Sequence, residues 1–155
     1  MINLLPMIPL VYFGIQLSII DFKSHRLPNN LVGAFALTEI FIMMGLSFVE
    51  SDLSRLVTAV GIAIATMSVY VLLYFISRGA LGMGDVKFAF PLGLCVGWCS
   101  AGLWLVAIFV SFFTAGTIAI IGLVTKQMTR KSRLAFGPFM SLGTMIVCGL
   151  AVFRQ

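Results

Sequence analysis

Two aspartates stand where the chain changes from apolar to polar, and together they could perform acid–base hydrolysis. Asp85 closes the motif Gly82-Met83-Gly84-Asp85 between two apolar segments, and Asp21 directly follows the first apolar segment. A carboxylate is costly inside a membrane, so an acid in or beside a membrane helix marks a candidate functional site. If the two carboxyl groups lie close together, burial and like-charge repulsion favour a pair that shares one proton.

Such a pair can hydrolyse a peptide bond with no metal ion. The ionised partner takes a proton from a bound water, which attacks the carbonyl carbon, and the protonated partner donates to the oxyanion or the leaving amine. Gly82 and Gly84 permit unusual φ angles and a close approach of a substrate backbone. Taken alone, however, Asp85 is equally well explained as a helix N-cap, and Asp21 is better explained as a residue at a helix end.

The composition is that of an integral membrane protein. Of the 155 residues, 61% are hydrophobic and 10% are charged, and the mean hydropathy is +1.13. In soluble domains, about a quarter of the residues are charged. The net charge of +5 is better explained by basic loops that set membrane orientation than by nucleic-acid binding. Three cysteines without a CxxC pair are typical of small core residues: Cys95, Cys99 and Cys148.

Six apolar segments predict an all-α, polytopic membrane protein with six transmembrane helices in one domain, residues 1–155. They cover approximately residues 4–20, 31–49, 56–77, 86–98, 102–124 and 134–153. The fourth has only about 13 residues, or about 20 Å of helix, so we expect it to tilt, thin the bilayer locally or begin below the membrane surface. After the first segment, Pro28 disfavours helical geometry at the residue before it, and Asn29 and Asn30 could cap the next helix.

Small residues and basic residues predict the packing and the orientation of these helices. Close helix packing is expected at Gly61, Ala63, Ala65, Gly116 and Ala119. With both termini periplasmic, eight of the ten basic residues share a side with Asp21 and Asp85: Lys23, Arg26, Arg78, Lys87, Lys126, Arg130, Lys131 and Arg133. Only Arg55 and Arg154 remain on the other side. The positive-inside rule therefore places both aspartates at the cytoplasmic face.

Three spaced motifs resemble those of the type IV prepilin peptidases, which belong to the G-x-G-D intramembrane aspartic peptidases. The first covers residues 21–29, with Asp21, Lys23 and Arg-Leu-Pro-Asn at residues 26–29. The second is Gly-Met-Gly-Asp-Val-Lys at residues 82–87, and the third is Phe-Gly-Pro-Phe at residues 136–139. The resemblance covers nearly the whole chain, although Leu27 stands where the family often has isoleucine.

This resemblance implies an aspartic endopeptidase of the bacterial inner membrane, with Asp21 and Asp85 as the catalytic pair and no cofactor. Its substrates would be prepilins or pseudopilins, cut between a short polar leader and an apolar helix at the cytoplasmic boundary. Larger members insert a cytoplasmic domain with paired cysteines and also methylate the new N-terminus. Because this chain has no such insertion, the resemblance is to the small branch that serves tight-adherence (Flp) pili, and no methyltransferase activity is expected.

Other motif residues have more than one interpretation. Lys87 could stabilise a neighbouring carboxylate or hold substrate carbonyls, and a loop lysine that sets orientation explains it equally well. Lys23 could steady the carboxylate of Asp21, although a role as an interface anchor is simpler. Gly137 and Pro138 are interpreted as shaping the entry to the last helix rather than touching the chemistry.

Two further functions remain open. In a proton or solute carrier, Asp21, Glu39 and Asp85 would form a relay, which would require ionisable groups throughout the membrane depth. Only Glu39 lies deep in its segment, and a neutral, hydrogen-bonded residue within the bundle is the favoured interpretation of it. His25 is most simply a solvent-exposed residue of the polar hairpin. The weakest hypothesis is a non-catalytic assembly subunit of a membrane complex.

Overall fold

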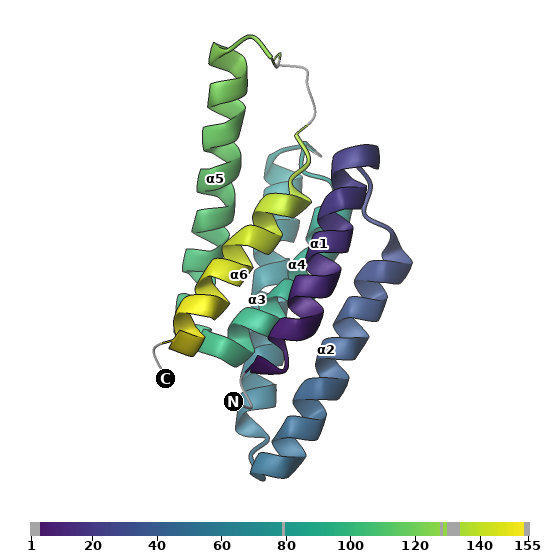
Figure 1. Ribbon diagram of the computed structural model, residues 1–155, viewed down its shortest axis with the longest axis vertical. Coiled ribbons are helices and arrows are strands. Elements are labelled where there is room, and N and C mark those ends of the chain that lie inside the picture. Colours follow the sequence, from purple (N-terminus) through teal and green to yellow (C-terminus); the bar gives the residue numbers. More distant parts are fainter. Residues whose placement is uncertain (1–3, 79, 128, 130–133, 154–155) are drawn as a thin grey trace.

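The computed structural model describes residues 4–78, 80–127, 129 and 134–153, and every regular element in these ranges is a helix. The helices alternate in direction within one bundle (Figure 1). This confirms the all-α prediction. The α-helices are α1 (Met7–Ser24), α2 (Asn29–Glu50), α3 (Ser54–Ile76), α4 (Met83–Ser100), α5 (Trp104–Val124) and α6 (Gly137–Phe153), and a 3₁₀ helix, η2 (Ala101–Leu103), links α4 to α5.

Helix α4 is the central helix of the bundle. Between Asp85 and Cys99 only Lys87 and Phe90 are not fully buried, and α4 packs against α2, α3 and α6. A helix that is apolar all round is expected in such a buried position. Its 18 residues correct the prediction of a short fourth helix over residues 86–98, because the Gly-Met-Gly-Asp motif contributes the first turn instead of a loop.

Helices α3 and α4 approach closely along a seam of small residues. A Cβ atom added at Gly93 would lie 2.7 Å from the Cα of Ala63, and one added at Gly97 would lie 2.7 Å from the Cα of Ala59. Small residues on both helices allow the backbones to come this close. The seam therefore fixes the position of α4, which carries Asp85.

Only part of the predicted small-residue packing is correct. Ala63 lies in the seam between α3 and α4 and is fully buried. Gly61 and Gly116 are exposed, and a Cβ atom added at either would meet nothing within 4 Å. Their predicted role in close packing is wrong, because each faces away from the neighbouring helices.

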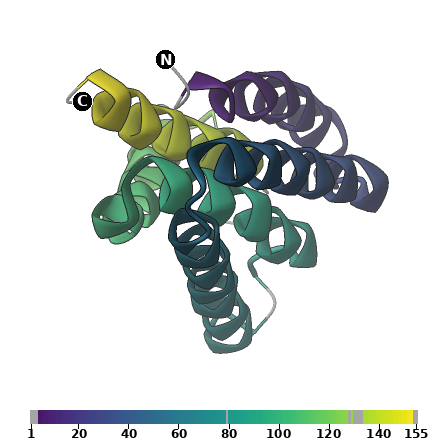
Figure 2. The ribbon, with the colours of Figure 1, turned by 90° about the horizontal axis from the view of Figure 1, so that it is seen from below.

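Helix α6 lies between α1 and α5, as the view along the bundle shows (Figure 2). On the α1 side, the Ser18 hydroxyl donates to the Ser141 hydroxyl at 3.4 Å. A Cβ atom added at Gly14 would lie 2.8 Å from the Cε of Met145. The first and last helices of the chain are thus held side by side.

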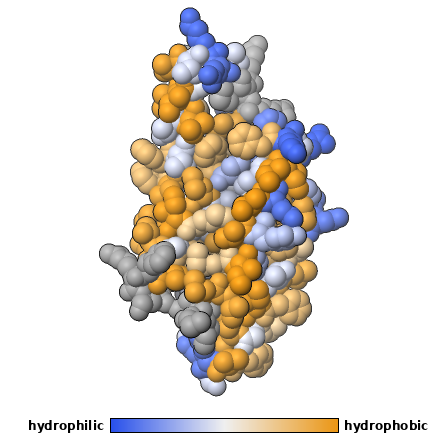
Figure 3. Space-filling view, in the orientation of Figure 1, coloured by the Kyte–Doolittle hydropathy of each residue, from blue (hydrophilic) through white to orange (hydrophobic). Residues whose placement is uncertain are grey.

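Apolar length and surface hydropathy agree with a membrane protein. Three helical segments are long and apolar enough to cross a membrane: Asn29–Glu50, Ser54–Ile76 and Met83–Val124, the last of which runs through α4, η2 and α5. Hydrophobic side chains cover most of the middle of the visible face, and hydrophilic ones gather mainly toward its ends (Figure 3).

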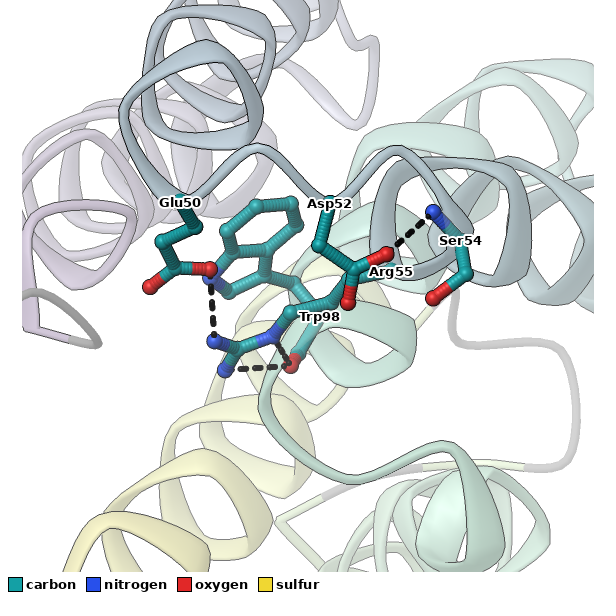
Figure 4. A network of polar contacts seen from close by, with 5 residues as sticks. All are labelled: Glu50, Asp52, Ser54, Arg55 and Trp98. Atoms are coloured by element: carbon teal, nitrogen blue, oxygen red, sulfur yellow. Dashed lines mark hydrogen bonds and ion pairs between the residues drawn. The ribbon is translucent and has the colours of Figure 1, made fainter.

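The cationic side chain of Arg55 lies at the carboxyl end of α4, far from Asp85 (Figure 4). The guanidinium of Arg55 lies 4.5 Å from the ring centroid of Trp98 and donates to the Trp98 carbonyl from Nε at 3.2 Å and Nη2 at 3.1 Å. Its Nη1 is 3.7 Å from the carboxylate of Glu50. A cation is favourable at the carboxyl end of a helix, so Arg55 ties the α2–α3 turn to α4.

Candidate active site

Asp21 lies within α1, near its carboxyl end. The helix continues to Ser24 and ends at His25, whose φ of 49° is left-handed and whose N–H donates to the Asp21 carbonyl at 2.8 Å. This corrects the prediction that the helix stops at residue 20. The side chain is 5% exposed, and its Oδ2 accepts a hydrogen bond from the backbone N–H of Gly137 at 2.9 Å.

Asp85 is the third residue of α4 and is 9% exposed. Its Oδ2 accepts a hydrogen bond from the backbone N–H of Gly82, the N-cap residue, at 3.2 Å. A carboxylate at this position often reaches back to the N-cap N–H of its own helix. The interpretation of Asp85 as the N-cap residue was therefore wrong, because Gly82 holds that position. Asp85 nevertheless stabilises the start of α4.

The two aspartates meet at one cavity. Both line a cavity of about 760 Å³ and an adjoining one of about 330 Å³, and they share both with His25 and Gly82. No cluster of three or more histidine, cysteine or acidic side chains that could hold a metal occurs in the described ranges.

The two cavities differ in their walls. The larger is mainly apolar, with side chains from α3, α5 and the segment before α6: Leu73, Ile76, Phe112, Leu134 and Phe136. The rings of Phe112 and Phe136 pack with centroids 4.7 Å apart, and Tyr70 packs against both. The smaller cavity includes polar and basic side chains: His25, Arg26, Asn29 and Lys87.

The motif glycines are needed for space rather than for unusual backbone angles. Gly82 has a φ of −72°, and Gly84 has no left-handed φ either. A Cβ atom added at Gly84 would lie 3.1 Å from the Cβ of Leu27, and one at Gly82 would lie 3.1 Å from Oδ2 of Asp85. The prediction of unusual φ angles was therefore wrong. Gly84 instead lets the hairpin after α1 pack against the start of α4.

The predicted supporting lysines do not contact the aspartates. The ammonium of Lys87 donates to Oδ1 of Asn29 at 2.9 Å, so Asn29 joins the two motifs instead of capping α2. Pro28 is the N-cap residue of α2, with a φ of −66°. Lys23 is exposed, and the ion pair between Arg55 and Glu50 is the only one in the described part of the chain.

Glu39 lies apart from both cavities, in the core between α2 and α4. It is 0% exposed, and its Oε1 accepts a hydrogen bond from the thiol of Cys95 at 3.2 Å. Its Oε2 has no partner in the structure. The prediction of a hydrogen-bonded bundle residue is confirmed. The prediction that Cys95, Cys99 and Cys148 are core residues is also confirmed, since all three are buried.

Residues far along the chain complete the site, and the sequence did not reveal all of them. Gly137 was expected only to shape the entry to α6, yet it donates to Asp21; the third motif was the available signal. Pro138 follows it in the first turn of α6, where proline is tolerated. No feature of the sequence indicated that Phe112 lines the site, because nothing in the apolar pattern of α5 sets it apart from its neighbours.

Two buried carboxyl groups that share a cavity in an apolar helical bundle are equipped for acid–base hydrolysis. A family model for type IV leader peptidases matches residues 8–125. The chain therefore belongs to the type IV leader peptidase family, whose members are aspartic prepilin leader peptidases. No curated protein and no solved structure matches the chain. The matched range includes Asp21 and Asp85 and ends before α6.

Proposed function

We propose that this protein is an intramembrane aspartic endopeptidase that removes the leader of Flp-type prepilins or pseudopilins at the cytoplasmic face of a bacterial inner membrane. Asp21 and Asp85 are its catalytic pair. The observation that carries the proposal is that α1 and α4 each bring one buried carboxyl group to the same cavity. Glu39, which a carrier would need as a relay, lies outside that cavity.

The proposed reaction uses only these carboxyl groups and a water molecule. The ionised partner removes a proton from the water as its oxygen attacks the scissile carbonyl, and the protonated partner donates to the oxyanion. Breakdown of the tetrahedral intermediate then returns a proton to the leaving amine. Backbone N–H groups of Gly137 and Gly82 hold one oxygen of each carboxylate, which leaves the other oxygen of each for water and substrate.

The contrast between the cavities supports a prepilin as substrate. The apolar wall that includes Leu73, Phe112 and Phe136 would contact the first apolar side chains of the mature pilin. The smaller cavity, with Asn29 and Lys87, offers polar groups to the leader backbone. A substrate that is polar before the scissile bond and apolar after it would match the polar smaller cavity and the apolar larger one.

The arrangement of the helices supports six membrane spans with periplasmic termini. The start of α1 and the end of α6 lie at one end of the bundle, and the carboxyl end of α1 and the start of α4 lie at the other (Figure 1). Basic residues in the described ranges at the aspartate end are Lys23, Arg26, Arg78, Lys87 and Lys126. The positive-inside rule makes that end cytoplasmic. Arg130, Lys131, Arg133 and Arg154 lie outside the described residues.

The short connection after α1 supports a single peptidase domain of the Flp type. Only residues 25–28 separate α1 from α2. This hairpin leaves no room for the cytoplasmic domain that bifunctional members insert there. We therefore propose that the chain cleaves its substrate without methylating the product.

Leader removal in cells tests the proposal. An Flp-type prepilin is co-expressed with the wild type, Asp21→Asn or Asp85→Asn, and the precursor and mature pilin are separated by gel electrophoresis and identified by mass spectrometry. We expect cleavage by the wild type and none by either variant. Asp52→Asn, at the opposite end of the bundle, is the control and should cleave normally. Cleavage by either dyad variant at the wild-type rate would show that the catalytic pair is wrongly assigned.

A further inference from the structure

We infer that the amino end of α6 positions the catalytic carboxylate, with Gly137 as a positioning residue for Asp21. This inference rests on the proposed function. It assigns a task to a residue beyond residues 8–125, the range that the family model matches. The task has two parts, which are a hydrogen bond from the Gly137 backbone and the space that its missing side chain leaves.

The contact between the two residues is direct and buried. The Gly137 N–H donates to Oδ2 of Asp21 at 2.9 Å. A Cβ atom added at Gly137 would lie 3.0 Å from that same oxygen and 3.4 Å from both the Cβ and the Cγ of Asp21. The carboxylate thus lies against the α-carbon of the glycine, and a larger residue would have to displace it.

The position of Gly137 explains why its N–H is free to donate. Gly137 is the first residue of α6, and the first N–H groups of an α-helix have no partner within the helix. These groups, together with the helix dipole, favour a negative charge. The buried side chain of Asp21 occupies this place, so the end of α6 holds one of its oxygens and fixes its orientation.

The packing of α1 against α6 sets this contact. Asp21, Ser18 and Gly14 lie about one turn apart on α1, and their partners Gly137, Ser141 and Met145 are spaced in the same way on α6. The Ser141 hydroxyl also donates to the Gly137 carbonyl at 3.1 Å. A shift of either helix along its axis would separate the carboxylate from its donor.

Two alanine variants of the same helix separate positioning from a general effect on α6. Gly137→Ala keeps the N–H but crowds the carboxylate, whereas Gly149→Ala adds a methyl group where nothing lies within 4 Å. Cleavage of a purified Flp-type prepilin is followed in detergent micelles. We expect Gly137→Ala to lower kcat by about 10- to 100-fold with little change in KM, and Gly149→Ala to resemble the wild type. Equal kcat for both variants would overturn the inference.

A third variant tests the hydrogen bond without requiring activity. Gly137→Pro removes the N–H at a helix position where proline is tolerated. Labelling of Asp21 by a hydrophobic carbodiimide is measured at one fixed pH by mass spectrometry. Because Oδ2 loses the donor that holds it, we expect the extent of labelling of Asp21 to rise in Gly137→Pro, and in Gly137→Ala to a smaller extent.

The two measurements distinguish the failure of this inference from the failure of the proposed function. If the wild type cleaves no prepilin but labelling of Asp21 shifts as expected, the positioning role stands and the proposed function fails. If the extent of labelling of Asp21 is the same in all variants, the positioning role fails. Thermal unfolding of each purified variant shows whether it is folded, and Gly137→Ala provides the answer if Gly137→Pro is not.

Discussion

Asp21 and Asp85 reach one cavity from opposite ends of their helices: Asp21 lies near the carboxyl end of α1, and Asp85 lies in the first turn of α4. If the pair shares one proton and acts as a unit, removing both acids should cost little more than removing one. We expect Asp21→Asn, Asp85→Asn and the double variant each to lose about 100- to 10,000-fold in kcat/KM, measured on a purified prepilin. Losses that multiply in the double variant would argue against a shared proton.

The seam between α3 and α4 predicts a difference between two glycines. Gly97→Ala would place a methyl group against Ala59 and Ile62, and such overpacking destabilises by about 1–3 kcal/mol. Gly61→Ala, on α3, meets nothing within 4 Å and should be neutral or slightly stabilising, because alanine is the better helix former. Thermal unfolding in detergent measures both. Equal stability of the two variants would contradict the close approach of the helices.

Glu39 distinguishes a peptidase from a carrier. Glu39→Gln preserves the volume of the side chain and an oxygen that can accept a hydrogen bond from the Cys95 thiol. It removes the ionisable carboxyl group that a proton relay would need. We expect unchanged prepilin cleavage and an unfolding temperature close to that of the wild type. Proton flux into proteoliposomes that depends on Glu39 would instead support the carrier.

Asp52, in the turn before α3, makes a small pH-dependent contribution to stability. Hydrogen bonds from Ser54, followed by the charge of Arg55, hold the pKa of Asp52 below its ordinary value of 3.8. A lowered folded pKa stabilises the protein above the unfolded value, and that contribution is lost as the pH falls through the folded pKa. We expect Asp52→Asn to unfold at a slightly lower temperature at pH 7, and the difference should shrink below pH 3.8 and disappear once the pH has fallen through the lowered folded pKa. A difference that persists in acid would contradict an electrostatic origin.

Features that depend on local composition could be predicted from the sequence. Apolar length predicted the helices, because each must bury or expose to lipid a continuous apolar segment. The positions of Asp21 and Asp85 within alternating helices predicted that they lie at the same end of the bundle. Helix ends were less predictable, because polar residues such as Asp21 continue a helix beyond its apolar segment as long as their backbone groups remain paired.

Features that depend on contacts between distant helices could not be predicted in this way. The bond from Gly137 to Asp21 uses a backbone N–H, which every residue except proline possesses. The third motif therefore marked Gly137 itself but did not indicate Asp21 as its partner. Phe112 lines the cavity because of how α5 packs against its neighbours. The interpretation of Gly61 failed for a related reason: a small residue permits close packing but does not determine which face of its helix meets a neighbour.

The position of both carboxylates near helix ends affects how much free energy is needed to unwind a substrate helix before cleavage. A peptide bond in the middle of a membrane helix is shielded by its own hydrogen-bond ladder, and exposing it in lipid leaves backbone groups unpaired. Asp21 is three residues before Ser24, the last residue of α1, and Asp85 is three residues after Gly82, the N-cap residue of α4. Under the proposed function, a pilin helix lying alongside would present its frayed first turn to this depth, and the bond to be cleaved would already be unwound.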